Sequence, residues 1–381
     1  MSAVPALAPP LLDLLGVHWP ADAPVTGLAW EADGGSVAYA LGDGHLLLAD
    51  ARWTGGPTLA PRPAGGVAVQ PAQSLAPAPR RAACHQGACL VVAADPAGGF
   101  VTGGDDGGVV RLPRQGAPAV LARTDGWVTA LDCGAGGCHA YASGHHAYRI
   151  GPDSGARIAL PAPATALAFH PDGRGLAISH HGGVTLWQAD GTTRLLAWPG
   201  YHRTLAWSPD GRYLVTGMQE NALHGWRVAD GGDIEMGGYP GQALSLSFSH
   251  DGRFLATSGA MRPVCWGFDP PGARQQPSEA GMDSRTPLTR VACHPRQPLI
   301  AAGYHNGAVV LCQPGSRESL FIKGAGAGAV NALAWSPDGT GLALGTQQGL
   351  CGWLSLPPGL FRPRAADHPT RHDHHHQELS A

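Results

Sequence analysis

The sequence repeats itself about every forty residues, and this repetition constrains the fold more than any other feature. The repeat is clearest over Thr204–Trp226, where the turn Ser208-Pro209-Asp210-Gly211 separates two short apolar runs and a third run ends at Trp226. Proline presets φ at the second turn position and glycine accepts a positive φ, so this tetrapeptide is typical of a tight turn. The unit therefore predicts three short antiparallel strands. Because so small a sheet is not stable alone, each unit must pack against its neighbours.

The same unit aligns along most of the chain. Eight copies can be anchored at the end of their first strand, at Trp30, Ala93, Cys133, Phe169, Trp207, Phe248, Cys293 and Trp335. Apart from the first interval, which holds an insert at about 51–83, the copies are spaced by roughly forty residues. A period of this size is typical of four-stranded propeller blades.

Two further signals recur in the repeats. The turn returns as His170-Pro171-Asp172-Gly173, Ser249-His250-Asp251-Gly252 and Ser336-Pro337-Asp338-Gly339, and the third strand closes with Trp187, Trp226, Trp266 and Trp353. In this combination the chain resembles the WD-repeat family over about residues 14–356. The resemblance implies an all-β fold: a single β-propeller of WD-repeat type with eight four-stranded blades, or seven if one of the degenerate repeats two and three is not a blade.

The sequence departs from the family pattern at two points. The Trp-Asp dipeptide is absent, and the turn position at which the family carries an Asp aligns with Asp in one repeat only, at Asp43. We therefore expect the propeller architecture, but not the family's hydrogen-bond network in most blades.

The chain divides into three parts by composition. We expect a flexible N-terminus at 1–13, a propeller over 14–361 and a disordered His-rich tail at 362–381, because the tail has too few apolar residues to repay the entropy of ordering. Pro357-Pro358 cannot donate to a sheet, so Leu14–Trp19 is expected to close the ring as the outer strand of the last blade. The insert is expected to add an outer strand near Gly66–Val69. It is either a tolerated surface insertion or an arm that docks a partner.

Composition excludes several classes of protein. The net charge of −3 offers no basic field for nucleic acid, and eight cysteines in 381 residues do not indicate a disulfide framework. The N-terminus lacks a basic leading region and is broken by Pro9-Pro10, so we expect neither a signal peptide nor a membrane span. The expectation is a cytoplasmic monomer with reduced thiols.

Histidine is the one chemically suggestive residue type, with 19 copies. Six lie in expected turns between second and third strands: His45, His145, His146, His180, His181 and His305. In the resembled family these turns open on one face of the ring, where several imidazoles could hold zinc or another transition metal. The alternative is that they replace the family Asp and bond to nearby backbone.

Two other groups could bind metal. The segment from Cys84 and His85 to Cys89 precedes the first strand of repeat two, and a second Cys-His cluster spans Cys133 to His139 at a turn on the opposite face. Their alternative interpretation is small buried side chains at strand ends. The tail carries His372, His374, His375 and His376, a tract that can chelate without a fold.

No catalytic motif stands out, since the Gly-rich stretch at 103–108 joins two expected strands and precedes no helix. The sequence therefore favours a non-enzymatic scaffold that binds one or more protein partners through its turns. The alternative is an accessory protein that binds or passes on zinc or a similar metal; no other cofactor is indicated.

Overall fold

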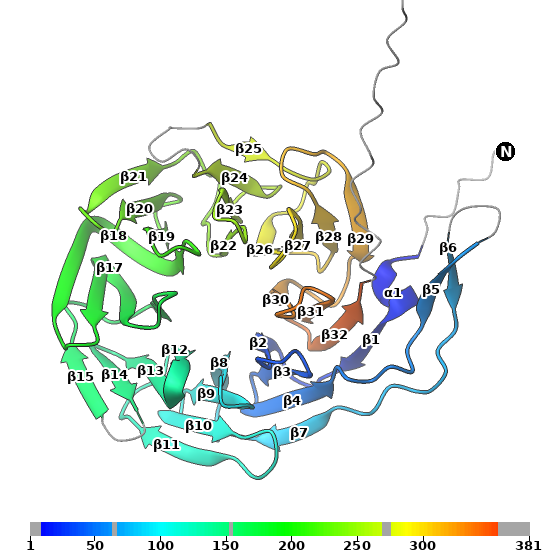
Figure 1. The fold of residues 1–381 in the computed structure, drawn as a ribbon, viewed down its shortest axis with the longest axis horizontal. Coiled ribbons are helices and arrows are strands. Elements are labelled where there is room, and N and C mark those ends of the chain that lie inside the picture. The colour runs from blue at the N-terminus through cyan, green and yellow to red at the C-terminus, as the bar shows by residue number, and fades with distance from the viewer. Residues whose placement is uncertain (1–8, 63–66, 152–154, 269–275, 357–381) are drawn as a thin grey trace, which may run out of the picture.

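The computed structural model describes residues 9–62, 67–151, 155–268 and 276–356. Over these ranges the chain forms β-sheets arranged in a ring about a central axis (Figure 1), with one short helix, α1 (Leu11–Leu15), and a 3-10 turn at Ala135–Gly137. In this part of the chain no helix has the length and apolar character needed to cross a membrane.

The ring begins with three four-stranded antiparallel sheets. The first contains β2 (Val25–Trp30), β3 (Ser36–Leu41), β4 (His45–Asp50) and β7 (Arg80–Ala83). The second contains β8 (Cys89–Ala94), β9 (Phe100–Gly104), β10 (Gly108–Leu112) and β11 (Ala119–Arg123). The third contains β12 (Ala130–Gly134), β13 (Cys138–Ser143), β14 (His146–Ile150) and β15 (Gly155–Ala159).

The next sheet has six strands: β16 (Ala166–Phe169), β17 (Gly175–Gln188), β18 (Thr193–Trp207), β19 (Tyr213–Met218), β20 (Leu223–Arg227) and β21 (Gly232–Met236). It is followed by a four-stranded sheet of β22 (Leu246–Phe248), β23 (Phe254–Thr257), β24 (Val264–Gly267) and β25 (Ser278–Glu279). Another consists of β26 (Leu288–Cys293), β27 (Ile300–Tyr304), β28 (Val309–Cys312) and β29 (Ser319–Lys323). The last combines β30 (Val330–Trp335), β31 (Gly341–Thr346), β32 (Leu350–Ser355) and the N-terminal β1 (Gly16–Pro20).

Counted by hydrogen bonding, the described ring has seven sheets, the number of the alternative prediction, rather than eight separate four-stranded blades. The degenerate repeats two and three each form a four-stranded sheet, so the lower number has another cause. The reason lies in β18, which runs without a break from one repeat into the next. Its residues Thr193–Tyr201 pair with β17, and His202–Trp207 pair with β19. The six-stranded sheet thus holds two sequence repeats. The inner strands β2, β8, β12, β16, the end of β18, β22, β26 and β30 contact one another in this order, and β30 contacts β2.

Burial follows the position of each strand in its sheet. The second strands β9, β19, β27 and β31 are buried along their whole length, because neighbouring sheets cover both of their faces. The outer strands β11 and β15 are largely exposed. The core therefore lies between the sheets, which explains why single repeats cannot fold alone.

The Trp that ends an inner strand links neighbouring repeats. The indole N–H of Trp30 donates to the carbonyl of Ala334 at 3.0 Å, and that of Trp335 donates to Ala292 at 3.0 Å. Trp207 donates in the same way to Ala168 of the preceding repeat at 3.2 Å. The recurring Leu-Ala-Trp sequence is thus a contact between repeats as well as a core element.

The N-terminal segment lies against the last repeat. Strand β1 pairs antiparallel with β32, from Gly16 opposite Leu354 to Pro20 opposite Leu350, as the outer strand of that sheet. The expected loose segment 1–13 is in part a helix, since α1 begins at Leu11 and buries the side chain of Leu12. Residues 1–8 and the tail 357–381 lie outside the described residues.

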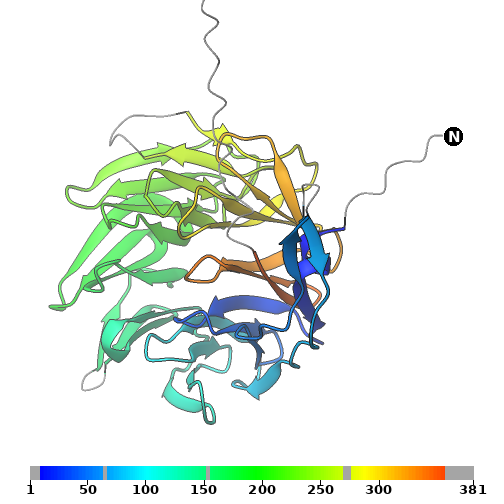
Figure 2. The ribbon, with the colours of Figure 1, turned by 45° about the vertical axis from the view of Figure 1, so that its right-hand side comes forward.

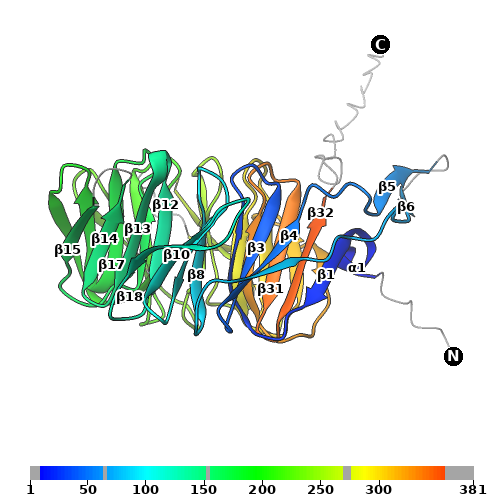
Figure 3. The same cartoon turned by 90° about the horizontal axis from the view of Figure 1, so that it is seen from below.

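The insert differs from the expectation. The outer strand of the first sheet is β7, which pairs with β4, and not a strand near Gly66–Val69. The strand expected there is β6 (Val67–Gln70), which pairs with β5 (Thr58–Pro61) in a separate hairpin. Figures 2 and 3 show this hairpin at the rim of the ring, beside α1. An alternating apolar pattern predicts a strand, but it does not predict with which other strand that strand will form hydrogen bonds.

Candidate functional site

The ring has two faces made of different connections (Figure 3). We call one the junction face: it consists of the turns between second and third strands and the connections that lead from an outer strand to the next inner strand. The two kinds of connection bond to each other. The N–H groups of Cys84 and His85 donate to Gly44 at 3.0 and 2.9 Å, and Leu288 donates to Ala260 at 2.9 Å. These bonds hold the junction face together from one repeat to the next.

Two of the predicted metal ligands on or near this face are occupied by hydrogen bonds within the chain. The side chain of His85 is fully buried, with Nδ1 2.9 Å from Asp106 Oδ1 and Nε2 2.9 Å from Thr102 Oγ1. His180 is also buried, with Nδ1 2.9 Å from the carbonyl of His181 and Nε2 2.9 Å from Thr185 Oγ1. Both ring nitrogens of each of these two histidines are therefore engaged in hydrogen bonds within the chain.

The other predicted histidines lie nearer the solvent. His45 is half-buried and its Nδ1 is 3.2 Å from the carbonyl of Asp43, whereas His145, His181 and His305 are exposed and His146 is partly exposed. Within 9–62, 67–151, 155–268 and 276–356, no three His, Cys, Asp or Glu side chains come close enough together to hold a metal ion. The tail residues His372, His374, His375 and His376 lie outside these ranges.

Burial changes the protonation of the cysteines that the sequence singled out. Burial raises the pKa of the Cys84 thiol to about 11 and raises that of Cys89 further. Burial also raises the pKa values of Cys133 and Cys138, at the turn on the opposite face. Because their pKa values are raised, these thiols are protonated at neutral pH, and the reactive thiolate form is scarce.

Sequence reasoning missed Asp106, which holds His85 in place. Burial alone would raise the pKa of Asp106, but the hydrogen bonds from the N–H of Gly108 and from His85 outweigh it and lower this pKa. Asp106 occupies the turn position of Asp43, since each accepts a hydrogen bond from the N–H two residues later, of Gly108 and His45 respectively. The signal that could have found Asp106 is the Val-Thr-Gly motif at Thr102, which recurs at Thr216.

Threonines at the position of Thr102 form hydrogen bonds with a His or Tyr side chain in other repeats. Thr216 Oγ1 lies 2.7 Å from His202 Nδ1, and Thr257 Oγ1 lies 2.6 Å from the hydroxyl of Tyr239, which accepts a hydrogen bond from Trp266 Nε1 at 2.6 Å. A buried network therefore survives in these repeats without the family Asp. Its role is to fix the turns of the junction face.

Large apolar side chains are exposed on the junction face. Trp127 is 63% exposed in the connection before β12, and Leu244, Met261 and Met282 are 37–40% exposed around the repeat of β22–β25. The other exposed large apolar residues of the described chain lie in the insert or on outer strands: Val69, Leu75, Val120, Leu195, Leu320 and Phe321. None lies in the turns of the opposite face.

Leu244, Met261 and Met282 lie in three loops that backbone hydrogen bonds connect, from Gly241 to Gly259 and from Leu288 to Ala260. Charged residues follow Met261 and Met282 directly in the sequence. Arg262 forms ion pairs with Glu279, at 2.8 Å, and with Asp283, and Arg317 lies 3.5 Å from Glu279. Exposed apolar side chains next to polar and charged ones are the usual composition of a protein–protein interface. We call Leu244, Met261 and Met282 the apolar cluster.

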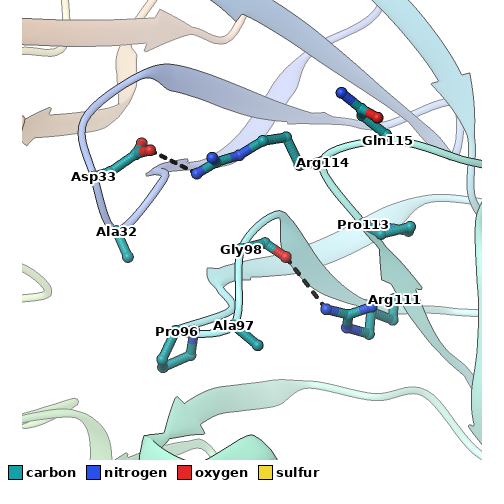
Figure 4. Close-up of a pocket in the computed structure, with 9 residues that line it drawn as sticks. All are labelled: Ala32, Asp33, Pro96, Ala97, Gly98, Arg111, Pro113, Arg114 and Gln115. Carbon is teal, nitrogen blue, oxygen red and sulfur yellow. Dashed lines mark hydrogen bonds and ion pairs between the residues drawn. The ribbon is translucent and has the colours of Figure 1, made fainter.

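The opposite face carries a pocket of about 420 Å³ between the first two repeats (Figure 4). The turns at Ala32–Asp33 and Pro96–Gly98 form one side, and Arg111 and Arg114 form the other. Arg114 donates to Asp33 and Arg111 donates to the carbonyl of Gly98. This pocket contains none of the residues that the sequence singled out.

Two comparisons with known proteins agree with the ring-shaped fold. The family model described as "WD domain, G-beta repeat" matches residues 201–227, the repeat that is clearest in the sequence. The chain superposes on the crystal structure of the computationally designed Ika8 protein with a TM-score of 0.68 at 16% identity, over 88% of this chain and 98% of that one. At this identity the likeness concerns the fold alone. No curated protein matches the sequence.

Proposed function

Because the chain is a WD-repeat β-propeller, we propose that it is a non-enzymatic scaffold which binds a partner protein through its junction face. Propellers of this family typically mediate protein interactions, but a fold alone does not assign a function. The support specific to this chain is the distribution of exposed apolar side chains.

The apolar cluster is the single observation that carries the proposal. A water-exposed Met or Leu in a loop gains little for the isolated chain, whereas burial against a partner removes apolar area from water at about 25 cal/mol per Å². Met adapts its shape to different surfaces and is enriched in protein interfaces. Trp127, the most exposed aromatic side chain of the described ring, supplies a second anchor on the same face.

The non-enzymatic part of the proposal is supported by the state of the reactive side chains. The buried thiols are protonated, and His85, His180 and His202 each use both ring nitrogens in hydrogen bonds within the chain. These contacts within the chain account for the buried histidines without a catalytic role.

The proposal is tested by partner capture with matched variants. Wild-type protein, the double variant Met261→Ser/Met282→Ser and the control Leu320→Ser/Phe321→Ser would be immobilised and exposed to extract from the native cells. The control removes a similar exposed apolar area from outer strand β29. We expect the same partner on wild type and control and its loss from the junction-face variant, with unchanged melting temperatures. Equal recovery on all three would refute the proposal.

A further inference from the structure

The first two repeats carry an acidic residue at the start of the turn between first and second strands. Three later repeats begin this turn with Ser208, Ser249 and Ser336 and two begin it with His170 and His294, whereas the first two begin it with Glu31 and Asp95. Both carboxylates are 1% exposed. A buried ionised group is unfavourable unless it is paired and hydrogen-bonded, so its presence in place of a neutral serine needs a reason.

Each buried carboxylate positions an arginine. Glu31 accepts from Arg114 Nε at 2.6 Å, from Ser36 Oγ at 2.7 Å and from the N–H of Gly99 at 3.1 Å. Burial raises the pKa of Glu31, but these bonds, led by that of Arg114, outweigh burial and lower it. Asp95 accepts from Arg111 Nε at 2.6 Å. Each guanidinium group is thus held by a buried carboxylate.

The two arginines line the pocket of Figure 4, and each keeps N–H groups that are not used in hydrogen bonds among the described residues. Beyond Nε, Arg111 uses Nη2 for the carbonyl of Gly98 at 3.3 Å, and Arg114 uses Nη2 for Asp33 at 2.6 Å. Among the described residues, Nη1 of either arginine bonds to no acceptor. The side chains are 30% and 49% exposed, so these donors are accessible. Positioned guanidinium groups suit planar anions, which they bind in bidentate fashion.

One lining residue decides which anion fits. Asp33 lies at the edge of the pocket, 45% exposed, and is paired with Arg114 and Arg52. Its charge repels a doubly charged phosphate more than a singly charged carboxylate, because Coulomb energy scales with the product of the charges. The volume of about 420 Å³ lies within the range of small-ligand pockets.

We propose that this pocket binds a carboxylate group of a ligand, an acidic side chain of a peptide or a small organic acid, between Arg111 and Arg114. The site lies on the face opposite to the junction face, so it goes beyond the proposed function and is tested separately. The negative charge of Asp33 offsets part of the positive charge of Arg114 and so lowers the affinity of the site for a carboxylate.

The test uses a labelled Glu-Ser repeat peptide, its Gln-Ser counterpart and glutarate, each titrated into the full chain. Asp33→Asn keeps the oxygen that accepts from the N–H of Gly35 at 2.8 Å but removes the charge. Glu31→Gln/Arg114→Gln removes one guanidinium together with its buried partner. We expect Asp33→Asn to bind the Glu-Ser peptide or glutarate about tenfold more tightly than wild type, and the double variant to lose binding.

The controls distinguish the source of the carboxylate. Binding of the Glu-Ser peptide but not of glutarate identifies a peptide ligand, and equal molar affinity for glutarate identifies a small acid; both support a carboxylate site. Binding of the Gln-Ser peptide at the same affinity overturns the proposal. The proposal is also overturned if the Asp33→Asn variant binds neither acidic probe. This test does not depend on whether the double variant folds. Junction-face variants should bind the acidic probes normally.

Discussion

Replacing His224 with Phe should make the folded chain less sensitive to acid. His224 is 0% exposed and lies between two indoles, stacked on Trp198 with ring centroids 3.7 Å apart and edge-on to Trp226 at 4.6 Å. Neither ring nitrogen has a hydrogen-bond partner among the residues that the structure describes. Burial lowers the pKa of His224 from 6.5 to about 4, against the opposing charge of Asp233.

The magnitude follows from this shift. An unfolded chain protonates the residue as pH falls through 6.5, whereas the folded chain does so only near pH 4. The unfolded state therefore binds more protons in this window, and stability is lost as pH falls. At about 1.4 kcal/mol per pH unit, the loss reaches about 3 kcal/mol near pH 4. Above pH 6.5 this group does not titrate in either state, and Phe should be equal or better because it keeps both ring contacts.

The assay is urea unfolding of wild type and His224→Phe at pH 7.5, 6.0, 5.0 and 4.5. The difference between the two free energies of unfolding should grow in favour of the variant as pH falls. His45→Phe, at a half-buried position on the junction face, is the matched control for the chemical change from imidazole to phenyl. Parallel curves for wild type and His224→Phe would show that the imidazole is not a source of acid sensitivity.

Three further outcomes are expected. Deleting residues 1–20 removes β1 and the buried Leu12 and Leu15, so the chain should lose roughly 3–6 kcal/mol of stability at 1.5–3 kcal/mol per leucine; an unchanged melting temperature would contradict the role of β1. Asp106→Ala leaves His85 Nδ1 without its partner and should cost about 1–3 kcal/mol in urea unfolding, while Asp105→Ala should cost less; equal costs would argue against the His85 contact. Untagged protein should lose any bound metal when residues 366–381 are removed, as measured by elemental analysis, because the described ring has no ligand group; metal retained at stoichiometric level would contradict this.

The ring itself could be predicted because its signals are local and repeated. The turn at Ser208–Gly211 and the Trp at position 226 recur at a spacing of about forty residues. The first predicts a tight turn and the second predicts the end of a third strand. The union of two repeats in one sheet could not be predicted, because Pro199-Gly200 is typical of a turn. In the structure this dipeptide lies inside the continuous strand β18.

The candidate sites were harder to predict because burial and pairing arise between repeats. The sequence places His180 in a turn and His85 just before a first strand, but it does not indicate that hydrogen bonds use both ring nitrogens of each. The pairing of Glu31 with Arg114 joins residues 83 positions apart, and nothing local in the sequence indicates it. The exposure of Met261 and Met282 likewise depends on what the neighbouring loops leave uncovered.

Photo-crosslinking in living cells tests the central claim, that the junction face binds a partner, most directly. A benzoylphenylalanine placed at position 282 in the apolar cluster would be compared with one at position 321 on outer strand β29. Both positions are similarly exposed, at 37% and 38%. The account predicts a discrete adduct with a partner protein from position 282 and a much weaker one from position 321. An equal yield from both positions, or an adduct from position 321 alone, would contradict it.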